Sequence, residues 1–182
     1  MTQLYQTILL FIERLGKLTG YLGLFLVINT ALVVALRYLF NWAPIALQET
    51  MTYLHASLFM LGAAYTLKND GHVRVDVFYQ HYTEKKKALV NLLGTVFLLF
   101  PTCLFILIIC FPYVESSWAM GERSVEGHGL PWLYALKALL LVQPLLLMLQ
   151  GIAEIINNVL ILQGRGSLQD QPISKDLSGG QL

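Results

Sequence analysis

Four apolar segments, each long enough to cross a bilayer, occupy most of this chain of 182 residues. They are expected at about residues 18–37, 45–67, 88–114 and 131–162, and a transmembrane helix needs about 20 such residues. Only 13% of the residues are charged, against about 25% in soluble domains, so the chain lacks the polar surface that a soluble fold requires. Because backbone groups in lipid must be paired within their own segment, the sequence predicts an all-α integral membrane protein with four transmembrane helices.

The two ends of the chain differ from the four spans. Residues 1–17 place apolar side chains at helical spacing, which suits a short amphipathic helix lying in the headgroup layer. An ordinary extension of the first transmembrane helix would give the same pattern, so both interpretations stay open. Residues 163–182 are rich in Gly, Ser, Gln and Asp, which predicts a disordered cytoplasmic tail.

The positions of lysine and arginine predict the orientation of the chain in the membrane. Nine of these residues lie before the first span, in the 68–87 connector or in the tail, and three lie near the other two loops. Cytoplasmic segments carry the excess of positive residues. We therefore expect both termini and the 68–87 connector in the cytoplasm, with the 115–130 loop outside.

The second span is the least lipid-like of the four. Five of its residues follow helical spacing and lie along one stripe: Glu49, Thr52, Ala56, Met60 and Ala63. Small residues let helices approach closely in a membrane and polar residues can bond across them, whereas lipid supplies no hydrophobic drive for helix association. The stripe therefore predicts a helix–helix contact face.

Three polar side chains in or beside the first two spans need partners. Asn29 lies in the middle of its span, where an unpaired amide is costly, so it should face protein. Glu49 lies near the same membrane surface as Arg37, so an ion pair across the short turn or a contact with another subunit is one interpretation. In the other, the charge of Glu49 simply favours the start of its helix.

The sequence carries no pattern that indicates an enzyme, a cofactor or a nucleic-acid site. His55 is the one histidine within a span, so a haem held by two histidines cannot be built from this chain alone. There is no Gly-rich phosphate loop or metal-ligand pattern, and the net charge is only +1. An accessory membrane subunit is therefore expected. The alternatives are a membrane anchor of a redox enzyme, with a quinone or haem near His55, and a channel or small transporter formed by oligomerisation.

Several motifs between Leu36 and Asp76 carry a resemblance to a known family. They are Arg37-Tyr38 after the first span, Glu49 early in the second, the run Leu-Gly-Ala-Ala from 61 to 64, and Gly-His-Val-Arg-Val-Asp from 71 to 76. With the four-span plan, this combination resembles the small membrane subunit of tripartite ATP-independent periplasmic (TRAP) transporters, the DctQ-like family, over about residues 10–162. The family often has two acidic residues where this chain has Gln48-Glu49, so only Glu49 can carry that charge.

The resemblance implies a part in sodium-driven uptake of an organic acid across the bacterial inner membrane. A periplasmic substrate-binding protein would deliver the substrate, and a large DctM-like membrane subunit would hold the substrate and sodium sites. The small subunit would pack on the scaffold of the large subunit and widen it, surrounded by membrane lipid and without a cofactor of its own.

On that interpretation a set of residues serves subunit packing or fixes the cytoplasmic connector, where His72, Arg74 and Asp76 would form a structural lock. A solvated loop with a local salt bridge is the alternative for the connector, and such a bridge contributes only ~0–1 kcal/mol at a surface. The full set is Asn29, Arg37, Tyr38, Glu49, Thr52, Ala56, Ala63, His72, Arg74 and Asp76.

Overall fold

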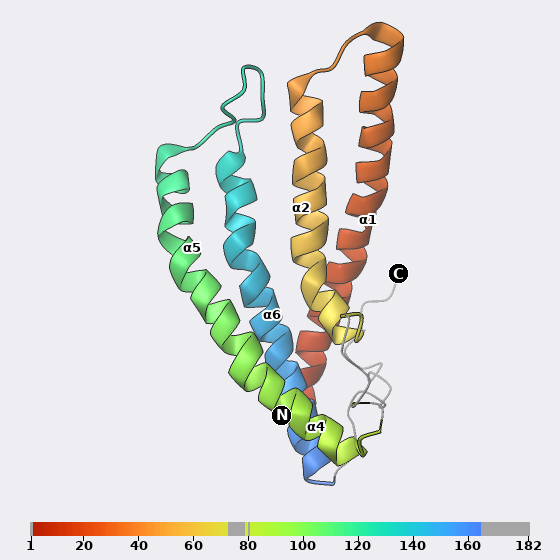
Figure 1. Cartoon of the computed structure of the whole chain (residues 1–182), viewed down its shortest axis with the longest axis vertical. Helices are drawn as coiled ribbons and strands as arrows, with labels where there is room; N and C mark the ends of the chain where they lie inside the picture. Colours follow the sequence, from red (N-terminus) through yellow and green to blue (C-terminus); the bar gives the residue numbers. More distant parts are fainter. Residues whose placement is uncertain (1, 73–78, 80, 165–182) are drawn as a thin grey trace.

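The computed structural model describes residues 2–72, 79 and 81–164, and within them the chain is helical (Figure 1). The all-α expectation is confirmed for this part of the chain. The elements are helices α1 (Thr2–Phe40), α2 (Ile45–Lys68), α4 (Glu84–Gly94), the π-helical turn η1 (Thr95–Leu99), α5 (Phe100–Met120) and α6 (Leu133–Leu162).

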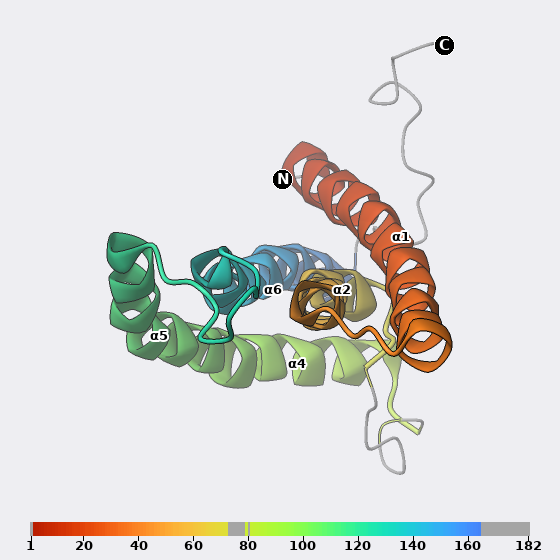
Figure 2. The same ribbon diagram turned by 90° about the horizontal axis from the view of Figure 1, so that it is seen from above.

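The long helices run alternately up and down and form two hairpins. The first hairpin is α1 with α2, and in the second the continuous α4–η1–α5 segment is followed by α6 (Figure 1). Helix α2 contacts both α1 and α6, so α2 and α6 form the middle of the arrangement (Figure 2). The turn 41–44 and the loop 121–132 lie at one end, and the start of α1 and the end of α6 lie at the other.

The most buried residues lie at the end where α1 begins. Ile12, Ala64 and Ala153, from α1, α2 and α6, are each 0% exposed. The two alanines leave room for the helices to approach closely. We call this set the buried cluster, and its members are Tyr5, Ile8, Leu9, Ile12, Ala64, Leu146, Ala153 and Ile156.

Helix α1 is continuous from Thr2 to Phe40. The helix has no break near residue 17, and the place of residues 1–17 in the headgroup layer or in the span stays a prediction. The apolar side chains of this half face α2 and α6 in the buried cluster, which explains their helical spacing.

The helix that contains the expected third span, residues 88–114, extends beyond it at both ends and includes an irregular turn. The helix runs from Glu84 to Met120. Pro101 has no N–H and its ring crowds the carbonyl four residues earlier. The preceding turn is π-helical, and the N–H of Phe100 donates to the carbonyl of Thr95, five residues back. A π-helical turn therefore precedes Pro101 in this helix.

Three helices in the described part of the chain are long and apolar enough to cross a membrane: Gln3–Phe40, Glu84–Met120 and Leu133–Leu162. Helix α2, which is also described, is less apolar than these three helices, although its 24 residues are long enough to cross a bilayer. Its deficit follows from its polar residues, which include Gln48, Glu49 and His55. Most of the predicted tail, residues 165–182, lies outside the described residues.

Candidate functional site

Glu49 lies in the second turn of α2 and organises the 121–132 loop. One carboxylate oxygen accepts a hydrogen bond from the hydroxyl of Ser124. The other accepts from the backbone N–H of Leu130 at 2.5 Å. The backbone N–H of Ser124 donates in turn to the carbonyl of Leu130 at 3.1 Å, which closes the loop. A single carboxylate on α2 thus holds the connection between α5 and α6.

Arg37 has a different partner from the one considered in the sequence. Its guanidinium donates to Oε1 of Gln48 at 3.3 Å, and Nε2 of Gln48 donates to the carbonyl of Ala43 at 3.1 Å. The ion pair between Arg37 and Glu49 is therefore not formed. The reason is helical geometry, because successive residues are turned by about 100° and Gln48 faces α1 while Glu49 faces the loop.

Asn29 joins the two helices of the first hairpin. It is 9% exposed, and its Nδ2 donates to the carbonyl of Leu47 at 2.9 Å. The amide faces protein, as a polar group in a span requires, and the protein it faces is α2 of the same chain.

The stripe on α2 is only partly covered by other helices of the same chain. Thr52 is exposed and Ala56 and Ala63 are half-buried, whereas the fully buried residue of α2 is Ala64. Thr52, His55 and Phe59 are all exposed and lie on one face of α2, and Phe59 is 72% exposed. We call these three residues the open face of α2.

A groove of about 460 Å³ runs between α1 and α2 beside this open face. Small side chains line much of it, including Ala63, and the exposed His72 also lines it. The other lining residues are Gly16, Thr19, Gly20, Leu58, Phe59, Gly62, Tyr65 and Thr66. Tyr38, at the other end of α1, is 79% exposed. Arg74 and Asp76 lie outside the described residues, so their predicted lock with His72 stays a prediction.

An ion-pair cluster that sequence reasoning missed links α1 to the end of α2. The ammonium of Lys68 contacts the carboxylate of Glu13, and Lys17 contacts the same carboxylate at 3.0 Å. The spacing of Glu13 and Lys17 by four residues was a signal for the second contact. Nothing in the sequence indicated that Lys68, so far along the chain, would join them.

A second ion pair fixes the other side of the 121–132 loop. Lys137 of α6 contacts Glu122, and its ammonium also lies 4.1 Å from the centre of the Tyr113 ring. The hydrogen bond from Lys137 lowers the pKa of Glu122 from its ordinary value. The loop is therefore held to α2 through Glu49 and to α6 through Glu122.

A pocket of about 200 Å³ lies between α2, the loop and the start of α6. Two carboxylates, those of Glu49 and Glu126, line it together with Tyr53 and Val125. The negative charges oppose the binding of an organic anion there. Among the described residues no group of histidine, cysteine and acidic side chains is placed to hold a metal ion.

The decisive comparison is with protein families. Residues 26–160 match the family model described as "Tripartite ATP-independent periplasmic transporters, DctQ component". The chain belongs to this family. No curated protein and no solved structure matches it.

The DctQ match begins within α1 and ends within α6, so it includes Asn29, Arg37, Glu49 and the 121–132 loop. The first half of α1, with Glu13 and its part of the buried cluster, lies before the matched residues. A DctQ component belongs to a transporter and not to an enzyme, and the match gives no support to a redox anchor.

Proposed function

We propose that the chain is the small permease subunit of a TRAP-type secondary transporter, which packs on the scaffold of a large DctM-like membrane subunit and widens it. The complex would carry out sodium-driven, binding-protein-dependent uptake of an organic acid across the bacterial inner membrane. The family match over residues 26–160 carries this proposal.

All four long segments, α2 included, span the membrane in this proposal. Because α2 lies between α1 and α6, it needs less apolar surface than a helix surrounded by lipid. Arg14 and Lys17 lie in the first half of α1, and Lys68, the last residue of α2, contacts Glu13 in that same half. This distribution favours placing the start of α1 in the cytoplasm and the 121–132 loop in the periplasm.

The large subunit covers the open face of α2. Thr52 and His55 are polar side chains in a span, and both would be costly in contact with lipid. Phe59 continues the same face and also lines the groove with Ala63, so aromatic and small surfaces lie side by side. A helix of the partner would cover the polar groups and use the small residues for close approach.

The substrate and sodium sites belong to the large subunit in this proposal. The pocket beside Glu49 and Glu126 is negatively charged, which is unsuited to an organic acid. The small subunit therefore contributes support for the scaffold and leaves the choice of substrate to its partners.

The first experiment is a pull-down of the tagged chain from its native membrane in mild detergent, followed by mass spectrometry. A stoichiometric large hydrophobic subunit, with loss of uptake when the chain is deleted, supports the proposal. Replacing the sodium gradient with choline should abolish that uptake. A dehydrogenase or haem-bearing partner would overturn the proposal.

A matched pair of variants tests whether the large subunit docks on the open face of α2. Phe59→Ala removes an aromatic side chain from the open face of α2, and Phe105→Ala removes one of similar exposure from α5. Buried aromatic side chains often dominate interface energy, so Phe59→Ala should lower recovery of the large subunit while Phe105→Ala should not. Equal recovery with both variants would contradict docking on α2.

A further inference from the structure

Three consecutive lysines lie in the first turn of α4, and two of them have no partner among the described residues. Lys87 contacts Glu84 at 3.7 Å, and its ammonium lies 5.7 Å from the centre of the Tyr79 ring. Lys85 and Lys86 are exposed, and neither forms an ion pair or a side-chain hydrogen bond with a described residue. The charges of Lys87 and Glu84 cancel, so two uncompensated positive charges remain at the start of this helix.

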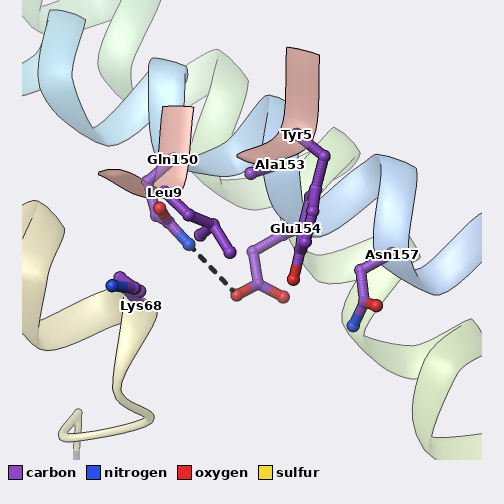
Figure 3. A pocket seen from close by; sticks show the side chains of 7 residues that line it. All are labelled: Tyr5, Leu9, Lys68, Gln150, Ala153, Glu154 and Asn157. Carbon is purple, nitrogen blue, oxygen red and sulfur yellow. Dashed lines mark hydrogen bonds between the residues drawn. The ribbon is translucent and has the colours of Figure 1, made fainter. Parts of the chain in front are cut away.

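The lysines of the first hairpin have a different setting. Lys68 contacts Glu13 and lines a small pocket between α1, α2 and α6, which the carboxylate of Glu154 also lines (Figure 3). Lys17 contacts Glu13 as well. These two lysines are paired within the protein, whereas the two unpaired lysines of α4 present their ammonium groups to the surroundings.

An exposed apolar stripe continues from the unpaired lysines along α4. Side chains four residues apart lie on one face of a helix, so Leu89 and Leu93 follow Lys85 on the same face. Both leucines are 46% exposed, and Phe97, in the next turn, is 68% exposed. Ala88, on the other side of α4, is 2% exposed, and α4 contacts α6. The outer face of α4 is therefore positive at its start and apolar beyond it.

This face matches the two parts of an anionic phospholipid. The apolar run of the helix begins directly after Lys87, so the lysine side chains reach the headgroup layer when the helix spans the membrane. An acidic segment of a soluble protein would neutralise the charges and leave the apolar stripe uncovered. A zwitterionic lipid would cover the stripe but carries no net charge for the two ammonium groups.

We propose that Lys85 and Lys86 bind the headgroup of an anionic phospholipid whose acyl chains lie along Leu89 and Leu93. The phosphate accepts hydrogen bonds from the ammonium groups, and the acyl chains cover the leucines one and two turns further along the helix. This inference requires only that α4 enters the membrane, so it is independent of the transport function and of the orientation of the chain.

Photo-crosslinking to lipid tests this proposal where the contact is expected. The full chain, with the membrane partners that purify with it, carries the photoreactive residue p-benzoylphenylalanine in place of Leu89. It is reconstituted in vesicles with equal amounts of phosphatidylglycerol and phosphatidylethanolamine of identical acyl chains, and mass spectrometry of the crosslinked peptide gives their ratio. One lysine near the surface favours an anionic lipid by about fivefold, so phosphatidylglycerol should be enriched about fivefold or more. A ratio equal to that of the vesicle would overturn the proposal.

Matched variants separate a local site from the general charge of the protein. Lys85→Gln with Lys86→Gln should return the ratio at position 89 to that of the vesicle, and arginine at both positions should keep the enrichment. Arg14→Gln with Lys17→Gln removes the same positive charge from α1 and should leave the ratio at position 89 unchanged. An equal fall with both glutamine pairs would show a long-range effect of net charge and would overturn the site. A crosslink to a polypeptide instead of lipid would overturn the lipid as occupant.

Discussion

Replacing Glu49 by alanine should release the 121–132 loop. The carboxylate accepts two hydrogen bonds, from the Ser124 hydroxyl and from the backbone N–H of Leu130. Hydrogen bonds to a charged group contribute about 1.5–3 kcal/mol each, and the half-buried position of Glu49 favours the lower value. The docked loop should therefore lose about 3 kcal/mol relative to its open form.

Hydrogen exchange of the Leu130 amide measures this loss directly, because a local opening exposes that N–H to solvent. A factor of ten corresponds to about 1.4 kcal/mol, so Glu49→Ala should speed exchange by about 100-fold. Glu49→Gln retains one neutral acceptor and should lose about 2 kcal/mol, or about 30-fold in exchange rate.

Glu115 supplies the control for charge. It is exposed near the same end of the molecule, so Glu115→Ala removes an equal charge without touching the loop contacts. The exchange rate of the Leu130 amide in Glu115→Ala should then be close to its rate in the unmodified chain. Unchanged protection of Leu130 in Glu49→Ala would refute the role of Glu49 in holding the loop.

Two other perturbations test the packing and the second loop contact. A Cβ added at Gly16 would lie 2.7 Å from Cβ of Tyr65, so Gly16→Ala should lower the free energy of unfolding by about 1–3 kcal/mol, measured by thermal unfolding. Gly20→Ala is the control, because nothing lies within 4 Å of its added Cβ, and it should be neutral or stabilising. The pKa of Glu122 is lowered in the folded state from its ordinary value of 4.5. The stability that its pair with Lys137 contributes is therefore fully present above pH 4.5, and it is lost as the pH falls through the lower pKa of the folded state. Glu122→Gln should abolish this part of the acid dependence of thermal unfolding, and an unaltered pH profile would argue against the pair.

The helices followed from local signals in the sequence. Residues 45–67 were expected for the helix that the structure places at Ile45–Lys68. Pro44 restricts the backbone before its start, and the Asn69-Asp70-Gly71 turn ends it. In that turn Asp70 has a positive φ of 53°, and the N–H of Gly71 closes the turn on Thr66.

The contacts of the candidate site were harder to predict, because they join residues far apart in the chain. Glu49 stood out as a charge in a span, but one of its partners is the backbone N–H of Leu130, a group that every residue except proline possesses. The sequence likewise did not indicate that Lys68 of α2 pairs with Glu13, since helical spacing relates only neighbours on the same helix. Sequence patterns therefore identified the polar residues that need partners without identifying the partners.

The position of the buried cluster sets an order for the biogenesis of this membrane domain. Tyr5, Ile8 and Ile12 leave the ribosome before α2 is made, whereas Ala153 and Ile156, which complete their burial, lie in α6, the last of the described helices to be synthesised. The early half of α1 must therefore wait, with its apolar side chains covered by lipid or by the insertion machinery, until α6 arrives. A ribosome that stalls before α6 would leave an insertion intermediate with an unclosed core.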